Sequence, residues 1–330
     1  PELVAGNALV ESSTFIAILL GTLMGGLMVT QEYGLVMMSL ALVVLSISGW
    51  VASLYMLPGP SYIKQTPQKR NAFQLTMNII EQTYRKKPIF LAILGLSWFW
   101  LVGVVFMTQI PNFVKMYLGG AVHIVTYFMT LFSLGVGVGS LLCHGLPRGK
   151  VSTKYVPLAL LFMSFFVYDV FAATHHMSKP QAAQTWLQFI LQPIAWRLSL
   201  DLFLAACFGG IYTVPLYAFI QHKSADQFRS RTIACNNIIN SIFMVLGLAL
   251  TGAALWLGIK LTMIFLCLSI ASFVVSIIIF GLIPEAFVKV MFGWVLKKLF
   301  RVTVHGLEHY EAVQGKAIVV ANHTSYLDAA

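Results

Sequence analysis

The chain has 330 residues, of which 58% are hydrophobic and 10% are charged, and its formal net charge is +10. A soluble globular domain is about 45–50% apolar and about 25% charged, so the composition excludes such a domain and indicates a polytopic membrane protein. The positive charge would suggest a nucleic-acid partner in a soluble protein, but here basic residues flank membrane spans, and no nucleic-acid partner is expected.

Eight stretches are long and apolar enough to cross a membrane, since a spanning helix needs about 20 mainly apolar residues. Two of them precede the longest polar loop and six follow it, which is the order expected around the middle of a transporter with two six-span halves. The eight spans are expected at 13–30, 35–57, 88–110, 122–144, 155–174, 199–220, 232–256 and 260–283.

We therefore expect an all-α polytopic membrane protein with 8 of about 12 spans present. Residues 1–57 would hold the last two spans of the N-terminal half, and 58–87 would form the loop between the halves. Residues 88–283 would form the six-span C-terminal half. The chain begins at Pro1 without a signal peptide and ends abruptly, which predicts an internal fragment of a longer protein.

Lysine and arginine are unequally divided between the two expected sides of the membrane. The loops 58–87, 145–154 and 221–231, together with everything after residue 284, hold 17 of the 21 basic residues. An excess of basic residues marks the cytoplasmic side. We therefore expect the loop 58–87 and the C-terminal segment to be cytoplasmic.

Two amphipathic segments are expected at the membrane surface. Residues 178–198 combine tryptophan, phenylalanine and glutamine side chains, and predict an interfacial helix broken near Pro193. Residues 284–300 carry apolar side chains at helical spacing with three lysines, and predict a helix lying on the inner leaflet. The short β-like runs in 301–330 then predict the start of a soluble α/β domain.

The last residues of the chain contain His323 and Asp328, directly after the apolar run 317–321. A neutral imidazole can take the proton of an alcohol that attacks a thioester, and a carboxylate can orient that imidazole. Residues five apart on a continuous helix lie about 140° apart, so the pair works only if His323 lies at a strand-to-helix turn. The alternative is a surface turn in which Asn322 or Ser325 caps a helix.

The run from Asn322 to Asp328 resembles the first motif of the glycerolipid acyltransferases, of the lysophosphatidic-acid acyltransferase type. The resemblance implies that His323 is the general base and Asp328 its partner. It also implies an acyl donor, either acyl carrier protein or acyl-CoA, and no bound cofactor. The later motifs of that family, which hold the phosphate of the acceptor, are not in the sequence.

Residues 1–283 resemble a second family, the lysophospholipid transporters of the major facilitator superfamily. The likeness rests on residues 97–100 (SWFW), on 109–113 (QIPNF), and on Arg229-Ser230-Arg231 followed by Asn236-Asn237. Transporters of this family occur fused to an acyltransferase and then to an acyl-carrier-protein synthetase. The order of transporter and acyltransferase in this chain matches that fusion.

Polar groups inside spans are candidate transport residues. For Asp169, ion coupling and a structural hydrogen bond are both open, whereas Asp201 is expected to form a structural ion pair with Arg197 on the same helix. Amide side chains could form a headgroup path or bonds between packed helices. These amides are Gln109, Asn112, Asn236, Asn237 and Asn240.

Other motifs have structural explanations. Gly135, Gly137 and Gly139 lie inside a span and are expected to allow close helix packing. The aromatic residues at 97–100 are expected mainly to pack or to lie at the membrane interface. His175-His176 alone, and four cysteines without metal-like spacing, predict no metal site.

Together these features predict a bacterial inner-membrane protein that flips lysophospholipid and re-acylates it in a cytoplasmic domain, with membrane lipids and the acyl donor as partners. The fragment itself is expected to be inactive. Two alternatives stay open. One is a transporter with a non-catalytic C-terminal extension, and the other is a transporter of another solute or drug with the same fold.

Overall fold

The computed structural model describes residues 2–29, 31–55, 71–120, 122–145, 153–177 and 185–282. These ranges contain ten α-helices, one short 3₁₀ helix and no strand. The predicted inner-leaflet helix at 284–300 and the predicted start of an α/β domain at 301–330 lie outside the described residues.

Eight of the described helices are long and apolar enough to cross a membrane, so the predicted number of spans is confirmed. In chain order the spanning helices are α1 (Glu2–Met28), α2 (Gly34–Leu54), α4 (Lys87–Tyr117), α5 (Val122–Gly145), α6 (Val156–Thr174), α8 (Pro193–Lys223), α9 (Arg229–Trp256) and α10 (Leu261–Leu282).

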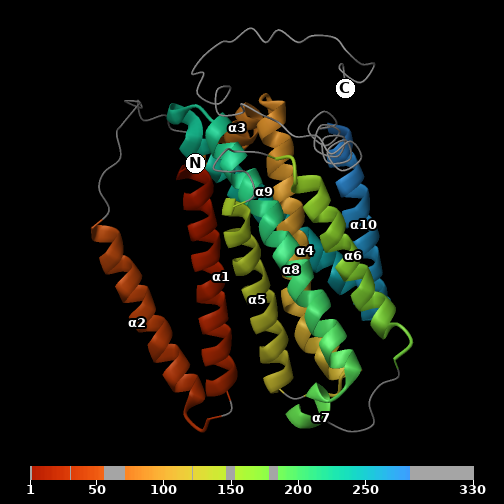
Figure 1. The fold of residues 1–330 in the computed structure, drawn as a ribbon. Coiled ribbons are helices and arrows are strands. Elements are labelled where there is room, and N and C mark those ends of the chain that lie inside the picture. The colour runs from red at the N-terminus through yellow and green to blue at the C-terminus, as the bar shows by residue number, and fades with distance from the viewer. Residues whose placement is uncertain are drawn as a thin grey trace, which may run out of the picture. The chain divides into compact units, whose positions relative to one another are not determined.

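The spanning helices run alternately up and down, so they define two ends of the bundle (Figure 1). One end holds the helix α3 (Ala72–Tyr84), the start of α4 and the 3₁₀ helix η1 (Asp226–Phe228). We call it the α3 end. The opposite end holds the short helix α7 (Trp186–Ile190) and is called the α7 end.

Helix α8 lies at the centre of the described bundle and packs against α1, α4, α5 and α6 (Figure 1). Close approach of α5 and α8 depends on glycine. A Cβ atom on Gly139 would lie 1.9 Å from the carbonyl oxygen of Cys207, and one on Gly210 would lie 2.4 Å from that of Val136. The expected role of the α5 glycines in helix packing holds for Gly135 and Gly139, whereas Gly137 has open space around it.

The segment before α8 differs from the prediction. Helix α7 has only five residues, and Pro193 is the first residue of α8 rather than a break in an interfacial helix. Proline suits this first position because its missing N–H has no intrahelical partner there. Thr185 and Gln188 cap α7 reciprocally, with Gln188 Oε1 accepting from the Thr185 N–H at 2.9 Å.

A helix also lies where the sequence predicted only a polar loop. Helix α3 buries Thr83 and packs Ile79 and Ile80 against the core, while Phe73 and Met77 are exposed. Two residues separate α3 from α4, and α4 continues through Pro111 to Tyr117, seven residues beyond its predicted end.

Candidate functional site

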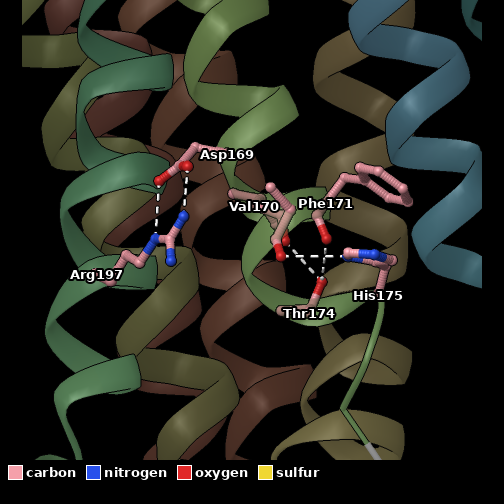
Figure 2. A network of polar contacts seen from close by, with 7 residues as sticks. Asp169, Val170, Phe171, Thr174, His175 and Arg197 are labelled. Atoms are coloured by element: carbon pink, nitrogen blue, oxygen red, sulfur yellow. Dashed lines mark hydrogen bonds and ion pairs between the residues drawn. The ribbon is translucent and has the colours of Figure 1, made fainter.

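An ion pair between two spanning helices joins α6 to α8. Arg197 donates from Nε to Asp169 Oδ2 at 3.0 Å and from Nη2 to Asp169 Oδ1 at 2.6 Å (Figure 2). Asp169 lies near the end of α6 and Arg197 near the start of α8, so both are about 6–8 Å from a helix end, at the α7 end of the bundle. The side chain of Arg197 is 50% exposed and that of Asp169 is 26% exposed.

Asp201 follows Arg197 by one helical turn, but the two do not form the predicted ion pair. The guanidinium group of Arg197 reaches across to α6 instead. Asp201 is only 3% exposed, its carboxyl group lies next to that of Asp169, and its Oδ2 atom is buried without a hydrogen-bond partner among the described residues. Two acids and one arginine therefore meet between α6 and α8.

The asparagines of α9 occupy two different environments. Asn240 is buried, and its Oδ1 accepts from Ser97 Oγ of α4 at 2.7 Å. Asn236 is also buried, and its Nδ2 donates to Asn237 Oδ1 at 3.2 Å. The Oδ1 atom of Asn236 has no hydrogen-bond partner among the described residues, and Asn237 is exposed. A buried amide oxygen without a partner is a candidate for contact with a ligand.

The two amides of α4 form a separate pair nearer the α7 end. Asn112 Nδ2 donates to Gln109 Oε1 at 3.0 Å, with Gln109 buried and Asn112 exposed. Gln109 lies twelve residues from Ser97, which is about 18 Å along a helix. The predicted transport residues therefore form three groups in the bundle, which lie on α6, on α9 and on the second half of α4.

Several polar contacts between helices could not be identified from the sequence. Trp98 donates to Ser272 at 3.1 Å and Trp100 to Tyr217 at 3.0 Å, so both indoles bond helices other than their own. The amides of Asn7 and Gln221 bond each other reciprocally, at 3.0 and 2.9 Å. Each contact joins residues more than a hundred positions apart. The sequence shows only that polar side chains lie within apolar spans, and it does not show which of them pair.

The described residues contain no group of three or more histidine, cysteine, aspartate or glutamate side chains that could hold a metal ion. The rings of His175 and His176 have centroids 3.5 Å apart. His175 Nδ1 lies 3.2 Å from the Ala172 carbonyl oxygen, and Figure 2 shows the His175 ring at the end of α6. The predicted catalytic residues His323 and Asp328 lie outside the described residues.

Comparison with known proteins gives one consistent result. The chain is similar to lysophospholipid transporters. It is 26% identical over 265 residues to the lysophospholipid transporter LplT of Escherichia coli strain K12 and to that of Shigella sonnei strain Ss046. The same identity holds for LplT of Escherichia coli O139:H28. Each alignment covers 78% of this chain and 60% of the relative's length.

No protein-family profile matches the chain. No solved structure matches it either. The eight apolar helices and the similarity to lysophospholipid transporters together identify a multi-pass membrane protein.

Proposed function

We propose that the chain is part of a bacterial inner-membrane transporter that moves lysophospholipid between leaflets and delivers it to a cytoplasmic acyltransferase domain. The observation that carries the transport part is the similarity to lysophospholipid transporters over 78% of the chain. The eight spans and the polar groups between α4 and α9 and between α6 and α8 are consistent with a path for a lipid headgroup.

In this proposal Arg197 makes the first contact with the headgroup. A guanidinium group has five N–H donors, and two of those of Arg197 bond Asp169. Half of the side chain is exposed, so other donors can reach a phosphate at the α7 end. In this proposal the α7 end is the outer one, because the excess of basic residues lies at the other end.

Deeper in the bundle, the amides of α9 would replace the water that the headgroup loses. Asn236 Oδ1 is buried without a described partner, so it can accept a hydrogen bond from a glycerol hydroxyl or an amine. The exposed amide of Asn237 adds a donor on the next residue. The acyl chain would stay among apolar side chains.

The acyltransferase part rests on the sequence motif. His323 would take the proton of the free glycerol hydroxyl as its oxygen attacks the thioester carbonyl carbon, and Asp328 would hold the imidazole in the correct tautomer. The C–S bond breaks, and the thiolate of the carrier leaves and receives the proton. Linking this domain to the transporter raises the effective concentration of the lysolipid at the active site.

One experiment tests both parts in the full-length protein. Labelled lysophosphatidylethanolamine is given to spheroplasts, and its uptake and its conversion to the diacyl lipid are measured separately. The proposal expects both, and expects His323→Ala to abolish conversion while uptake persists. His309→Ala, which changes another histidine of the same segment, is the control and should change neither.

Each failure has a separate meaning. If the cells take up no lysophospholipid, the chain transports another solute and the proposal is wrong. If uptake occurs but His323→Ala leaves conversion unchanged, the C-terminal segment is not the acyltransferase.

A further inference from the structure

A pocket of about 290 Å³ lies at the α3 end, between α3, the start of α4, η1 and α9. It is separate from the polar groups assigned above to transport. Three of its eight lining residues are cationic and none is acidic: Ile79, Gln82, Thr83, Arg85, Lys86, Phe228, Arg231 and Thr232. The pocket therefore combines donors and positive charge with an aromatic wall.

Two of the cations share one aromatic ring. The Nζ atom of Lys86 lies 4.9 Å from the ring centroid of Phe228, and the guanidinium carbon of Arg231 lies 5.9 Å from it. Both distances are within the range of a cation–π contact. Neither cation forms an ion pair with a residue that the structure describes. The nearby carboxylate of Asp226 bonds Arg229 Nη2 at 2.5 Å, so it does not neutralise the pocket.

The third cation lies at the edge of the pocket. Arg85 Nη2 bonds Glu81 Oε1 at 2.7 Å, and both side chains are largely exposed. The hydroxyl groups of Thr83 and Thr232 donate to the carbonyl oxygens of Ile79 and Phe228, each four residues earlier in the chain. The donors that remain for a ligand are therefore Lys86, Arg231, the amide of Gln82 and, at the edge, the other N–H groups of Arg85, which suit a ligand made of acceptor oxygens.

The pocket is expected at the level of the lipid headgroups, because its cations lie where two spans begin. Lys86 directly precedes the span that begins at Lys87, and Arg231 is the third residue of α9. Helix α3 buries one face against the bundle and exposes large apolar side chains, among them Phe73 and Met77, that lie outside any span. Such a helix is expected to lie in the membrane interface.

We propose that this pocket binds the phosphate of a glycerophospholipid headgroup from the leaflet at the α3 end. Arg231 offers a planar pair of donors to two phosphate oxygens, and Lys86 adds a point charge beside it. The Phe228 ring holds both cations in place. The apolar side chains that α3 exposes favour a lipid rather than a free anion as the source of the phosphate. The inference uses no residue of the proposed transport path, so it does not depend on it.

Lipid binding to the purified full chain tests the proposal. The protein is titrated with phosphatidylglycerol in detergent, and bound lipid is counted by native mass spectrometry. A diacyl galactolipid, which has the same tails but no phosphate, is the control ligand. We expect one phosphatidylglycerol to bind tightly, and the galactolipid to bind no more than nonspecifically. Equal binding of the two lipids would overturn the proposal.

Substitution locates the site. Lys86→Gln and Arg231→Gln should each weaken binding about fivefold, because one basic residue near a charged lipid is worth about 1 kcal/mol. The matched control is Lys115→Gln with Lys260→Gln, which removes two cations at the α7 end and should leave binding unchanged. Thermal melting of each variant identifies any that fail to fold, and each single substitution is a test on its own. Binding that survives both single substitutions in folded protein would contradict the assignment.

Competition distinguishes the two sources of phosphate. Inorganic phosphate should displace phosphatidylglycerol only weakly, because it lacks the tails that contact the interface. If inorganic phosphate competes as well as the lipid does, the pocket is a site for a free anion and the lipid assignment is wrong.

Discussion

The guanidinium group of Arg197 holds the carboxylate of Asp169 through two hydrogen bonds, of 3.0 and 2.6 Å, across 28 residues of chain (Figure 2). The contact joins α6 to α8 close to the α7 end. Two parallel N–H···O bonds fix the orientation of both side chains more tightly than one bond would. The pair therefore sets how these two helices meet and where Arg197 can present its remaining donors.

This pair should stabilise the protein measurably but modestly. In a double-mutant cycle with Asp169→Asn and Arg197→Gln, we expect a coupling free energy of about 1 kcal/mol, the upper end for exposed ion pairs, because the contact is bidentate. Half of the Arg197 side chain is exposed, which limits the value through solvent screening. The measurement is the free energy of unfolding in mixed micelles.

The pair of Arg85 with Glu81 is the internal control for that cycle. It has a similar length of 2.7 Å, but its side chains are 76% and 60% exposed and are four residues apart on the chain. Such a pair is worth about 0.3–0.5 kcal/mol. A coupling for Asp169 and Arg197 no larger than this would contradict the structural role given to them.

A second prediction concerns the stability of the bundle where α5 and α8 pack closely. Gly139→Ala should destabilise the bundle by about 1–3 kcal/mol, because the new Cβ would overlap the Cys207 carbonyl and force the helices apart. Gly137→Ala is the matched control, two residues away on the same helix with nothing within 4 Å of its Cβ. It should be neutral or stabilise by up to about 1 kcal/mol through helix propensity. Equal melting temperatures for the two variants would show that the helices are not this close.

The number of spans was predictable because spanning is a local property of the chain. An apolar run of sufficient length marks a membrane helix whatever packs against it. The ends were less predictable, since Pro193 begins α8 and Pro111 lies inside α4. Helix α3 was missed because its buried face, with Ile79 and Ile80, is short and lies in a polar loop.

The partners of charged groups were not predictable, because they are set by packing between helices. Spacing favoured Arg197 with Asp201, four residues apart, yet helical side chains point back toward the N-terminus. The side chain of Arg197, which precedes Asp201 by four residues, therefore points away from it. This order of a basic and an acidic residue on a helix is the less favourable one. Asp169 on α6 lies within reach instead, and only the packing of α6 on α8 determines that.

Neighbouring asparagines on α9 allow the proposed headgroup path to be separated from helix packing. Asn240→Leu should lower the free energy of unfolding by about 1 kcal/mol, because it removes the hydrogen bond that Ser97 of α4 donates to α9. Asn236→Leu should lower the free energy of unfolding by less, because the Oδ1 atom of Asn236 has no hydrogen-bond partner among the described residues. If Asn236 contacts the headgroup, it is this variant that should lose uptake of labelled lysophospholipid at unchanged expression. Unchanged uptake would remove Asn236 from the path.

The orientation of the bundle can be tested at two exposed positions near its opposite ends. Leu257 follows α9 at the α7 end, and Gln227 lies in η1 at the α3 end. A cysteine in place of Leu257 should react with a membrane-impermeant maleimide in intact spheroplasts. A cysteine in place of Gln227 should react only after permeabilisation, because basic residues of the α3 end mark the cytoplasmic side.

The native cysteines interfere little with this measurement. Cys143, Cys207 and Cys235 are buried, and Cys267 lies within the span of α10, so Cys267→Ser gives a suitable background. The background protein should stay unlabelled before and after permeabilisation. The reverse pattern at the two positions would place the α3 end outside. Helix α10 ends at the α3 end (Figure 1), so an acyltransferase domain that follows it in the chain could then not meet a cytoplasmic acyl donor, and the proposed coupling of transport to re-acylation would be wrong.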